Sequence, residues 1–331
     1  MAEEKLVYTG ITFTNGVNRR YLYSDSPETI RPTATPKVPA SPANGYLTGT
    51  TFNANERLDF ELYHHNEYGV EKKFGIVVQN DNSTSVTLTL HNRAINTVKG
   101  DQRKQQDMTA VLMVNYFNSA ATTITIPAKS SRFVLEANVP TANLVYGKLS
   151  MTSNKGNVYV RVVYGDKSKA ADYYFTLAKQ VTAQPDFFSG QVNYIQKNAT
   201  VDANSVKTFV LGEWPPKIKA SDDRPFINHD EYEKVLSHKD GGNDVLGGNY
   251  GVIYQVKINN LNGRRVKLAP DDFVTNEWRI CNRIVFRVGN TWYTSDTLDK
   301  SNPSVYMTLY NDTLTIVIPG GNAANLPFYI E

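Results

Sequence analysis

The sequence predicts an all-β protein with two antiparallel β-sandwich domains, an extended N-terminal arm and one short helix. Segments in which apolar and polar residues alternate recur along most of the 331 residues, as expected for strands that bury one face. Polar turns separate these segments. Hydrophobic residues make up 40% of the chain and charged residues 20%, which is enough apolar material for cores and too little charge for a disordered protein.

Residues 1–45 are expected to form a strand or hairpin followed by a proline-rich arm. The strand's apolar stripe consists of Val7, Thr9, Ile11 and Phe13. Asn15 and Gly16 form a hairpin-type turn before a second strand at 20–23. Five prolines between 26 and 44 remove backbone donors and fix φ, so this segment is predicted to be an extended linker or a surface arm.

The first sandwich domain is expected at residues 46–183. Its clearest strand places Leu58, Phe60 and Leu62 on one face, with polar residues between them. Short strands separated by polar turns are typical of antiparallel sandwiches. The strands predicted in this domain are 58–63, 74–78, 85–90, 108–116, 122–126, 131–135 and 158–164.

The second sandwich domain is expected at residues 184–331. An irregular polar stretch at 214–248 contains the only predicted helix, from Asp230 to Ser237, and a turn region is predicted at 198–205. The predicted strands are 191–195, 207–211, 252–258, 266–268, 284–288, 292–293, 305–310 and 314–318.

Catalytic motifs are missing from the sequence. It contains no nucleophile elbow, phosphate loop, dinucleotide fingerprint or paired-histidine zinc motif, so we assign no catalytic residue and expect no enzyme activity. His64 and His65 are neighbours on a predicted strand, and their side chains therefore point to opposite faces and do not jointly chelate an ion. We expect one imidazole to be hydrogen-bonded under the sheet edge and the other to lie at the surface.

The weak candidates for metal ligands lie around the predicted helix and the glycine-rich turn after it. They are His229, Asp230, His238, Asp240 and Asp244. Acidic residues at the start of a helix and a histidine at its end suit the helix dipole without any metal. A single glycine-rich turn lacks the stacked copies that a calcium β-roll requires. We therefore expect no metal or other cofactor, and folding that is insensitive to chelators.

Charge, cysteine content and hydropathy argue against nucleic-acid binding, an internal disulfide and a membrane span. Lys plus Arg number 35 against 32 for Asp plus Glu, and this balance of +3 gives no basic surface for nucleic acid. Cys281 is the only cysteine, so no internal disulfide is expected. No apolar run approaches about 18 residues, so no membrane span is expected. The acidic start, residues 1–5, is unlike a secretory signal, which is either absent or already removed.

Several short motifs resemble one protein family. They are Tyr63-His64-His65-Asn66, the segment from Lys73 to Val78 with Asn80, Val163 to Ser168, Gly248 to Val252 with Tyr254, and Pro319 to Pro327. In these motifs the chain resembles exported Gram-positive bacterial β-proteins of unassigned role, which are often associated with copper-amine-oxidase-like N-terminal modules. The resemblance implies β-architecture and a location outside the cell or at its surface, and no catalytic residue.

The favoured function is that of a non-enzymatic extracellular or cell-surface structural protein that assembles with itself into fibres or layers. The stripe of Val7, Thr9, Ile11 and Phe13 is the expected interface, because a tethered strand needs a sheet edge for its backbone groups. It pairs either with its own chain or, by strand donation, with a neighbour. One alternative is a carbohydrate-binding surface protein with a flat strip of tyrosine and tryptophan. The other is a virion structural protein.

Overall fold

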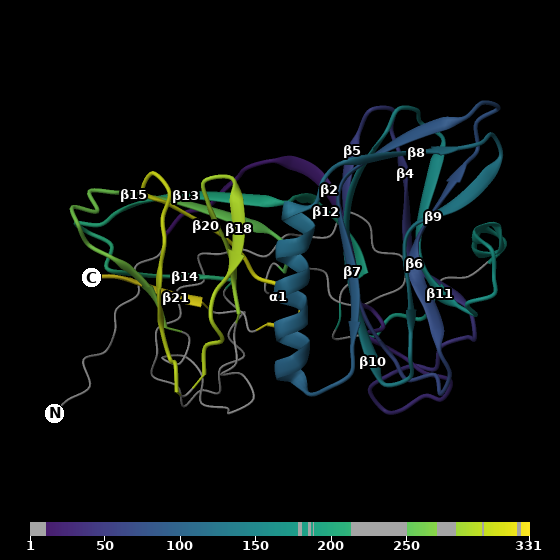
Figure 1. Cartoon of the computed structure of the whole chain (residues 1–331), viewed down its shortest axis with the longest axis horizontal. Coiled ribbons are helices and arrows are strands. Elements are labelled where there is room, and N and C mark those ends of the chain that lie inside the picture. Colours follow the sequence, from purple (N-terminus) through teal and green to yellow (C-terminus); the bar gives the residue numbers. More distant parts are fainter. Residues whose placement is uncertain are drawn as a thin grey trace. The chain divides into compact units, whose positions relative to one another are not determined.

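The computed structural model of the chain describes residues 11–177, 181–184, 187, 189–212, 250–269, 283–299, 301–322 and 326–331 (Figure 1). Strands dominate this part, which confirms the predicted all-β class. The described residues form two compact units: a large unit within 19–193, and a small unit within 11–18 and 194–331. The described part of the chain thus starts in the small unit at Ile11, builds the large unit and then returns to the small unit. These limits differ from the predicted boundaries at 45/46 and 183/184.

The large unit is a sandwich of two sheets. The first has the order β12 (Ser189–Tyr194), β2 (Asn18–Ser24), β5 (Arg57–Asn66), β10 (Asn143–Ser153), β7 (Val86–Val98) and β8 (Thr122–Ile126), and β3 (Thr29–Ile30) also pairs with β5. The second has the order β4 (Gly45–Phe52), β11 (Val158–Gly165), β6 (Lys72–Asn80) and β9 (Ser130–Val139). Between them lies one apolar core, to which Leu58, Phe60 and Leu62 contribute as the alternation predicts.

The small unit also contains two sheets around one core. The first has the order β1 (Thr14–Asn15), β13 (Gln196–Asp202), β15 (Ile253–Asn259), β20 (Thr313–Val317), β17 (Val285–Val288) and β18 (Thr291–Thr294). The second has the order β14 (Thr208–Leu211), β21 (Leu326–Ile330), β16 (Val266–Leu268) and β19 (Val305–Met307). Tyr254, Phe209 and Phe328 are fully buried in its core.

Both units depart from the predicted purely antiparallel pairing. In the large unit, β2 and β3 run parallel to β5, with Leu22 opposite Phe60 and Thr29 opposite His65. In the small unit, β13 runs parallel to β15. Parallel neighbours require a long connection. The proline-rich arm provides one in the large unit, because it crosses from β2 through β3 to β4 before the chain turns into β5.

The predicted N-terminal hairpin is wrong for the described residues. Thr14 on β1 pairs with Asn198 on β13, and the backbone N–H of Gly16 donates to the carbonyl of Gln196 over 2.8 Å, so the chain continues without turning back. Ile11 and Phe13 of the predicted stripe do not lie in a strand: β1 begins only at Thr14. Ile11 is nevertheless buried, and Phe13 packs edge-on against Tyr254 with ring centres 5.7 Å apart. Val7 and Thr9 lie outside the described residues.

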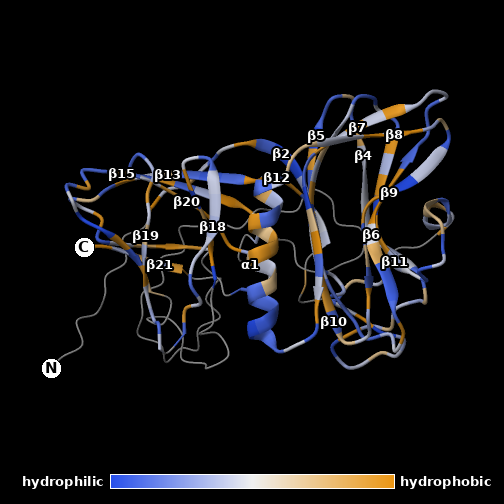
Figure 2. Cartoon of the chain, in the orientation of Figure 1, coloured by the Kyte–Doolittle hydropathy of each residue, from blue (hydrophilic) through white to orange (hydrophobic). Residues whose placement is uncertain are grey.

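A helix, α1 (Gln102–Asn118), replaces the strand predicted at 108–116. Asp101 caps its start by accepting a hydrogen bond of 3.0 Å from the backbone N–H of Lys104. The buried positions Gln106, Thr109, Ala110 and Met113 follow the i, i+3, i+4, i+7 spacing of a helix face. Two of these buried residues, Gln106 and Thr109, are polar, so the apolar residues alone do not show the helical spacing. The continuous apolar run at 110–114 instead favours a buried strand. The first turns of α1 are hydrophilic, and most of its hydrophobic residues come later (Figure 2).

Other differences concern the limits and the number of the strands. The turn predicted at 198–205 overlaps β13, which continues to Asp202. β4, β10 and β21 were not predicted as strands. β10 is buried on both faces along almost its whole length, so its polar residues Lys148 and Ser150 do not meet solvent as those of a half-buried strand do. A short 3₁₀ helix, η1 (Ala171–Phe175), lies over the outer face of the second sheet. The helix predicted at 230–237 lies outside the described residues.

Candidate functional site

The richest group of ionisable side chains in the described residues lies on the first sheet of the large unit, on the face away from the sandwich core. The alternation that turns Leu58 and Phe60 of β5 inward turns Asp59 and Glu61 to this second face. Lys148 of β10 is the register partner of Glu61. Helix α1 lies along β7 and β10 of the same sheet (Figure 1).

Glu61 and Lys148 form a buried ion pair. Lys148 Nζ lies 2.5 Å from Glu61 Oε2. Tyr21 Oη donates to Oε2 over 2.5 Å, and Tyr146 Oη donates to Oε1 over 2.7 Å. Glu61 is 0% exposed and the Lys148 side chain 4% exposed, so the pair is shielded from solvent. Burial, together with the negative charge of Glu61, raises the pKa of Tyr21 and keeps its phenol a donor.

Aromatic rings surround the ammonium group of this pair. Lys148 Nζ lies 4.6 Å from the ring centre of Tyr21 and 5.5 Å from that of Tyr116 on α1. A cation over an aromatic face is attracted by the ring quadrupole. The same helix residue donates from its phenol to Oδ1 of Asp59 over 3.0 Å, and Arg19 Nη1 lies 3.1 Å from Oδ2. Two buried carboxylates therefore connect β2, β5, β10 and α1.

A second acidic pair lies in the arm that follows β2. Burial, and then the charges of Glu28 and Glu61, raise the pKa of Asp25 well above its usual value. Burial raises the pKa of Glu28 to about 7. In the described residues Asp25 Oδ1 has no hydrogen-bond partner. Glu28 Oε1 lies 3.6 Å from Nε2 of His65. Protonation of these two carboxyls therefore reduces the cost of burying them.

A serine–histidine pair resembles a catalytic dyad only in its geometry. Ser24 Oγ lies 2.9 Å from Nε2 of His64, whose Nδ1 lies 2.8 Å from the carbonyl of Pro27. Both side chains are completely buried, and burial lowers the pKa of His64 to about 4. No substrate from solution reaches the buried Ser24 hydroxyl in this structure, and the two bonds of His64 hold the arm against β5. The interpretation of one hydrogen-bonded imidazole fits His64, and His65 is partly exposed.

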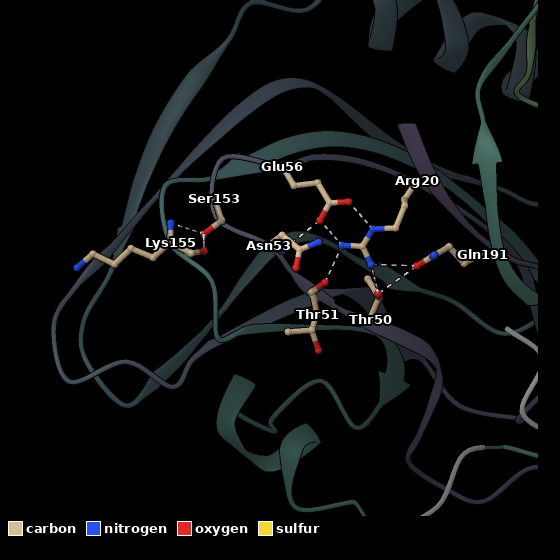
Figure 3. A network of polar contacts seen from close by, with 8 residues as sticks. All are labelled: Arg20, Thr50, Thr51, Asn53, Glu56, Ser153, Lys155 and Gln191. Carbon is tan, nitrogen blue, oxygen red and sulfur yellow. Dashed lines mark hydrogen bonds and ion pairs between the residues drawn. The ribbon is translucent and has the colours of Figure 1, made fainter. Parts of the chain in front are cut away.

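Arg20 organises a polar network in the large unit (Figure 3). Its guanidinium group forms a bidentate ion pair with Glu56. It also donates to Thr50 Oγ1 over 3.0 Å, to the carbonyl of Thr51 over 2.8 Å and to Gln191 Oε1 over 3.3 Å. Burial acts to raise the pKa of Glu56, but hydrogen bonds from Arg20 and Asn53 outweigh it and lower that pKa. The network joins β2, β4 and β12 to the turn before β5.

The predicted metal ligands His229, Asp230, His238, Asp240 and Asp244 all lie outside the described residues. The part of the chain that the structure does describe contains no group of three or more histidine, cysteine, aspartate or glutamate side chains able to hold a metal ion. The same part contains no helix that is both long and apolar enough to cross a bilayer.

Exposed tyrosines occur on both units, and cations cover some of the rings. Tyr306 on β19 is 42% exposed, but the guanidinium carbon of Arg265 lies 3.4 Å from its ring centre. Tyr293 and Tyr310 of the small unit are 46% and 54% exposed. Trp292 is buried, and Trp214 and Trp278 lie outside the described residues. A sugar platform requires free ring faces, and the face of Tyr306 under Arg265 is not free.

The buried cluster is not evident from the sequence. In the sequence, Glu61 is only one of the polar residues between Leu58, Phe60 and Leu62. Lys148 lies 87 residues further along the chain, in a strand that was not predicted. The only sequence signal is a lysine between apolar residues at 144–149, and that signal does not identify its partner.

Comparison with known proteins yields little. No protein-family model and no curated protein matches the chain. The CUB1-EGF-CUB2 domains of rat MASP-1 share 8% identity over 91% of this chain and 99% of that chain, with a TM-score of 0.19. The CUB1-EGF-CUB2 domain of human MASP-1/3 shares 8% identity over 88% and 100%, with a TM-score of 0.18. Scores this low carry no argument about fold or function.

Proposed function

We propose that this chain is a non-enzymatic structural β-protein that acts outside the cell or at the cell surface and associates with copies of itself. The observation that supports the proposal is the burial of the Glu61–Lys148 cluster. General acids, bases and nucleophiles must reach their substrate. Here the carboxylates, the phenols and the ammonium group contact one another, and they join three strands to a helix.

Self-association is proposed to use an open sheet edge in the large unit. β8 is the last strand of its sheet, and among the described strands it pairs only with β7. It consists of two isoleucines and three threonines, without a charge or a proline. Natural edge strands usually carry charges, prolines or bulges that prevent pairing with other chains. An unprotected edge of this kind favours strand addition from a second copy.

The experiment places charges on this edge. We expect the intact protein to form larger species as its concentration rises, measured by light scattering after size-exclusion chromatography and by negative-stain microscopy. The double variant Thr123→Lys/Thr125→Lys should remain monomeric, because two ammonium groups on the edge disfavour pairing. The control Val111→Lys/Asn115→Lys adds the same charge to exposed positions of α1 and should associate normally.

The same measurements test strand donation by the N-terminus. Removing residues 1–10 deletes Val7 and Thr9 but leaves Ile11 and Phe13 in their positions within the small unit. If association is lost in this truncated protein and retained in the β8 variant, the interface is the N-terminal segment. A chain that is monomeric at every concentration would contradict self-association by either route.

Carbohydrate binding is a second candidate, supported by the exposed rings of Tyr293 and Tyr310. An aromatic ring stacks on the apolar face of a sugar while its hydroxyl stays in water. Glycan-array binding that is retained in Thr123→Lys/Thr125→Lys and lost in Tyr293→Ala/Tyr310→Ala would favour this function over assembly.

A further inference from the structure

Glu61 and Lys148 occupy the geometry of a reactive pair as well as that of an ion pair. Their Cα atoms are partners in the register of β5 and β10, and Nζ lies 2.5 Å from Oε2. Both side chains are held in place, since Glu61 accepts hydrogen bonds from Tyr21 and Tyr146, and the Lys148 ammonium lies against aromatic rings. We propose that the two side chains condense into an isopeptide bond that joins β5 covalently to β10.

The reaction needs no oxidant and no other reactant. A proton first moves from the Lys148 ammonium to Oε2 of Glu61, which gives a neutral amine and a carboxylic acid. The lone pair of Nζ then attacks the carboxyl carbon, and a C–N bond forms while negative charge develops on Oε1. A second proton moves from nitrogen to Oε2, the C–Oε2 bond breaks, and one water molecule leaves. Ammonium plus carboxylate thus becomes amide plus water.

The two tyrosines lie where this reaction needs donors. Tyr146 donates to Oε1, the oxygen that becomes an oxyanion when the amine adds. Tyr21 donates to Oε2, the oxygen that leaves, and also lies 3.3 Å from Nζ. Its phenol therefore touches both the group that loses the second proton and the group that receives it. Tyr21 and Tyr146 are the residues to which we assign catalytic roles in this step.

Burial favours the amide over the separate groups. In dilute water, amide formation from an amine and an acid is unfavourable, but groups held in a near-attack geometry reach effective molarities of roughly 10⁵–10⁸ M. Burial also raises the cost of keeping two full charges, and the neutral amide removes that cost. Glu61 and Lys148 are almost completely shielded from solvent, so hydrolysis of the product lacks water.

Other lysine–glutamate pairs in the chain serve as internal controls. Lys73 Nζ lies 3.0 Å from Glu136 Oε2, but the glutamate side chain is 46% exposed. Lys167 lies 2.8 Å from Glu71, and their side chains are 59% and 37% exposed. These pairs match the buried pair in chemistry and nearly match it in distance, but water reaches them. They are expected to remain ion pairs.

The test is the intact mass of the purified, denatured chain. We expect the wild-type protein to be lighter than its sequence by one water molecule, and a tryptic digest to contain a branched peptide that joins the Glu61 segment to the Lys148 segment. Lys148→Arg keeps the charge without forming the amide and should have the full mass. Lys73→Arg should still lack one water. Tyr146→Phe should increase the fraction of purified chains that still have the full mass.

A wild-type chain of full mass, without the branched peptide, would overturn the proposal, and this outcome does not depend on the stability of any variant. A branched peptide between Lys73 and Glu136 would overturn it too, because burial would then not be the deciding factor. The inference goes beyond the proposed function. A monomeric chain can carry the cross-link, and an assembling chain can lack it.

Discussion

The phenol of Tyr116 donates a hydrogen bond of 3.0 Å to Oδ1 of Asp59, and this bond links α1 to β5 across the outer face of the sheet. Both residues are buried. A buried carboxylate that loses a donor keeps its full desolvation penalty. Tyr116→Phe should therefore lower the free energy of unfolding by about 1–3 kcal/mol, measured by urea denaturation.

The matched control for this variant is Val111→Ala on the same helix. Val111 is 48% exposed, and alanine has the higher helix propensity, so its stability should be unchanged or slightly higher. If Tyr116→Phe were as stable as wild type, the hydrogen bond would contribute nothing and α1 would be held by its apolar residues alone.

Strands that bury one face could be predicted, and strands or helices with unusual burial could not. Leu58, Phe60 and Leu62 alternate with polar residues because one face of β5 lies in the sandwich core. In β10 the pattern is less clear, since the face away from that core carries an apolar ring, Tyr146, as well as the polar Lys148 and Ser150, all of them buried. Helix α1 was mistaken for a strand because Gln106 and Thr109, both polar, lie on its buried face.

The candidate site could not be predicted from the sequence for a related reason. In a strand with one apolar face, residues such as Asp59 and Glu61 are expected to meet water. Here tyrosines from distant segments and a lysine cover them instead. Which strands become neighbours is decided by long-range pairing, and a single sequence contains no direct record of that pairing.

Arg20 should not be replaceable by lysine. Its planar guanidinium contacts Glu56 in a bidentate manner and donates to Thr50 and Thr51 at the same time, whereas an ammonium group is a compact point charge. Arg20→Lys should destabilise the large unit by about 1–2 kcal/mol in thermal or urea unfolding. Lys167→Ala removes an exposed ion pair with Glu71 and should leave the transition unchanged. Equal effects of the two variants would contradict a special role for the network.

Gly75 is required by close approach of two strands. A Cβ atom at this position of β6 would lie 2.4 Å from the carbonyl oxygen of Leu135 on β9, near the irregularity in their pairing. Gly75→Ala should therefore destabilise the fold by roughly 1–3 kcal/mol, because backbone must move. Gly156→Ala is the control, since its new Cβ would meet nothing closer than 3.7 Å. Circular-dichroism melting curves distinguish the two, and a normal melting temperature for Gly75→Ala would show that β9 shifts without cost.

The last prediction concerns pH and the arm after β2. Glu28 has a pKa of about 7 in the folded chain against an ordinary value of 4.5, because it is buried. The folded state therefore holds this proton more tightly than the unfolded state. The stability it contributes is fully present below pH 4.5 and is lost as pH rises to about 7. Burial and the charges of Glu28 and Glu61 shift the pKa of Asp25 in the same direction.

His64 acts in the opposite sense over a neighbouring range. Its pKa is about 4 in the folded chain and 6.5 ordinarily, so its contribution is lost as pH falls from 6.5 towards 4. A substitution of Glu28 separates the two effects. In Glu28→Gln the stability of the large unit should fall less between pH 5 and pH 8 than in wild type. The difference should be at most about 3 kcal/mol, since each unit of pKa corresponds to about 1.4 kcal/mol. Urea titrations at several pH values measure this difference. Parallel pH profiles for the wild type and Glu28→Gln would show that Glu28 has the same pKa in the folded and the unfolded state.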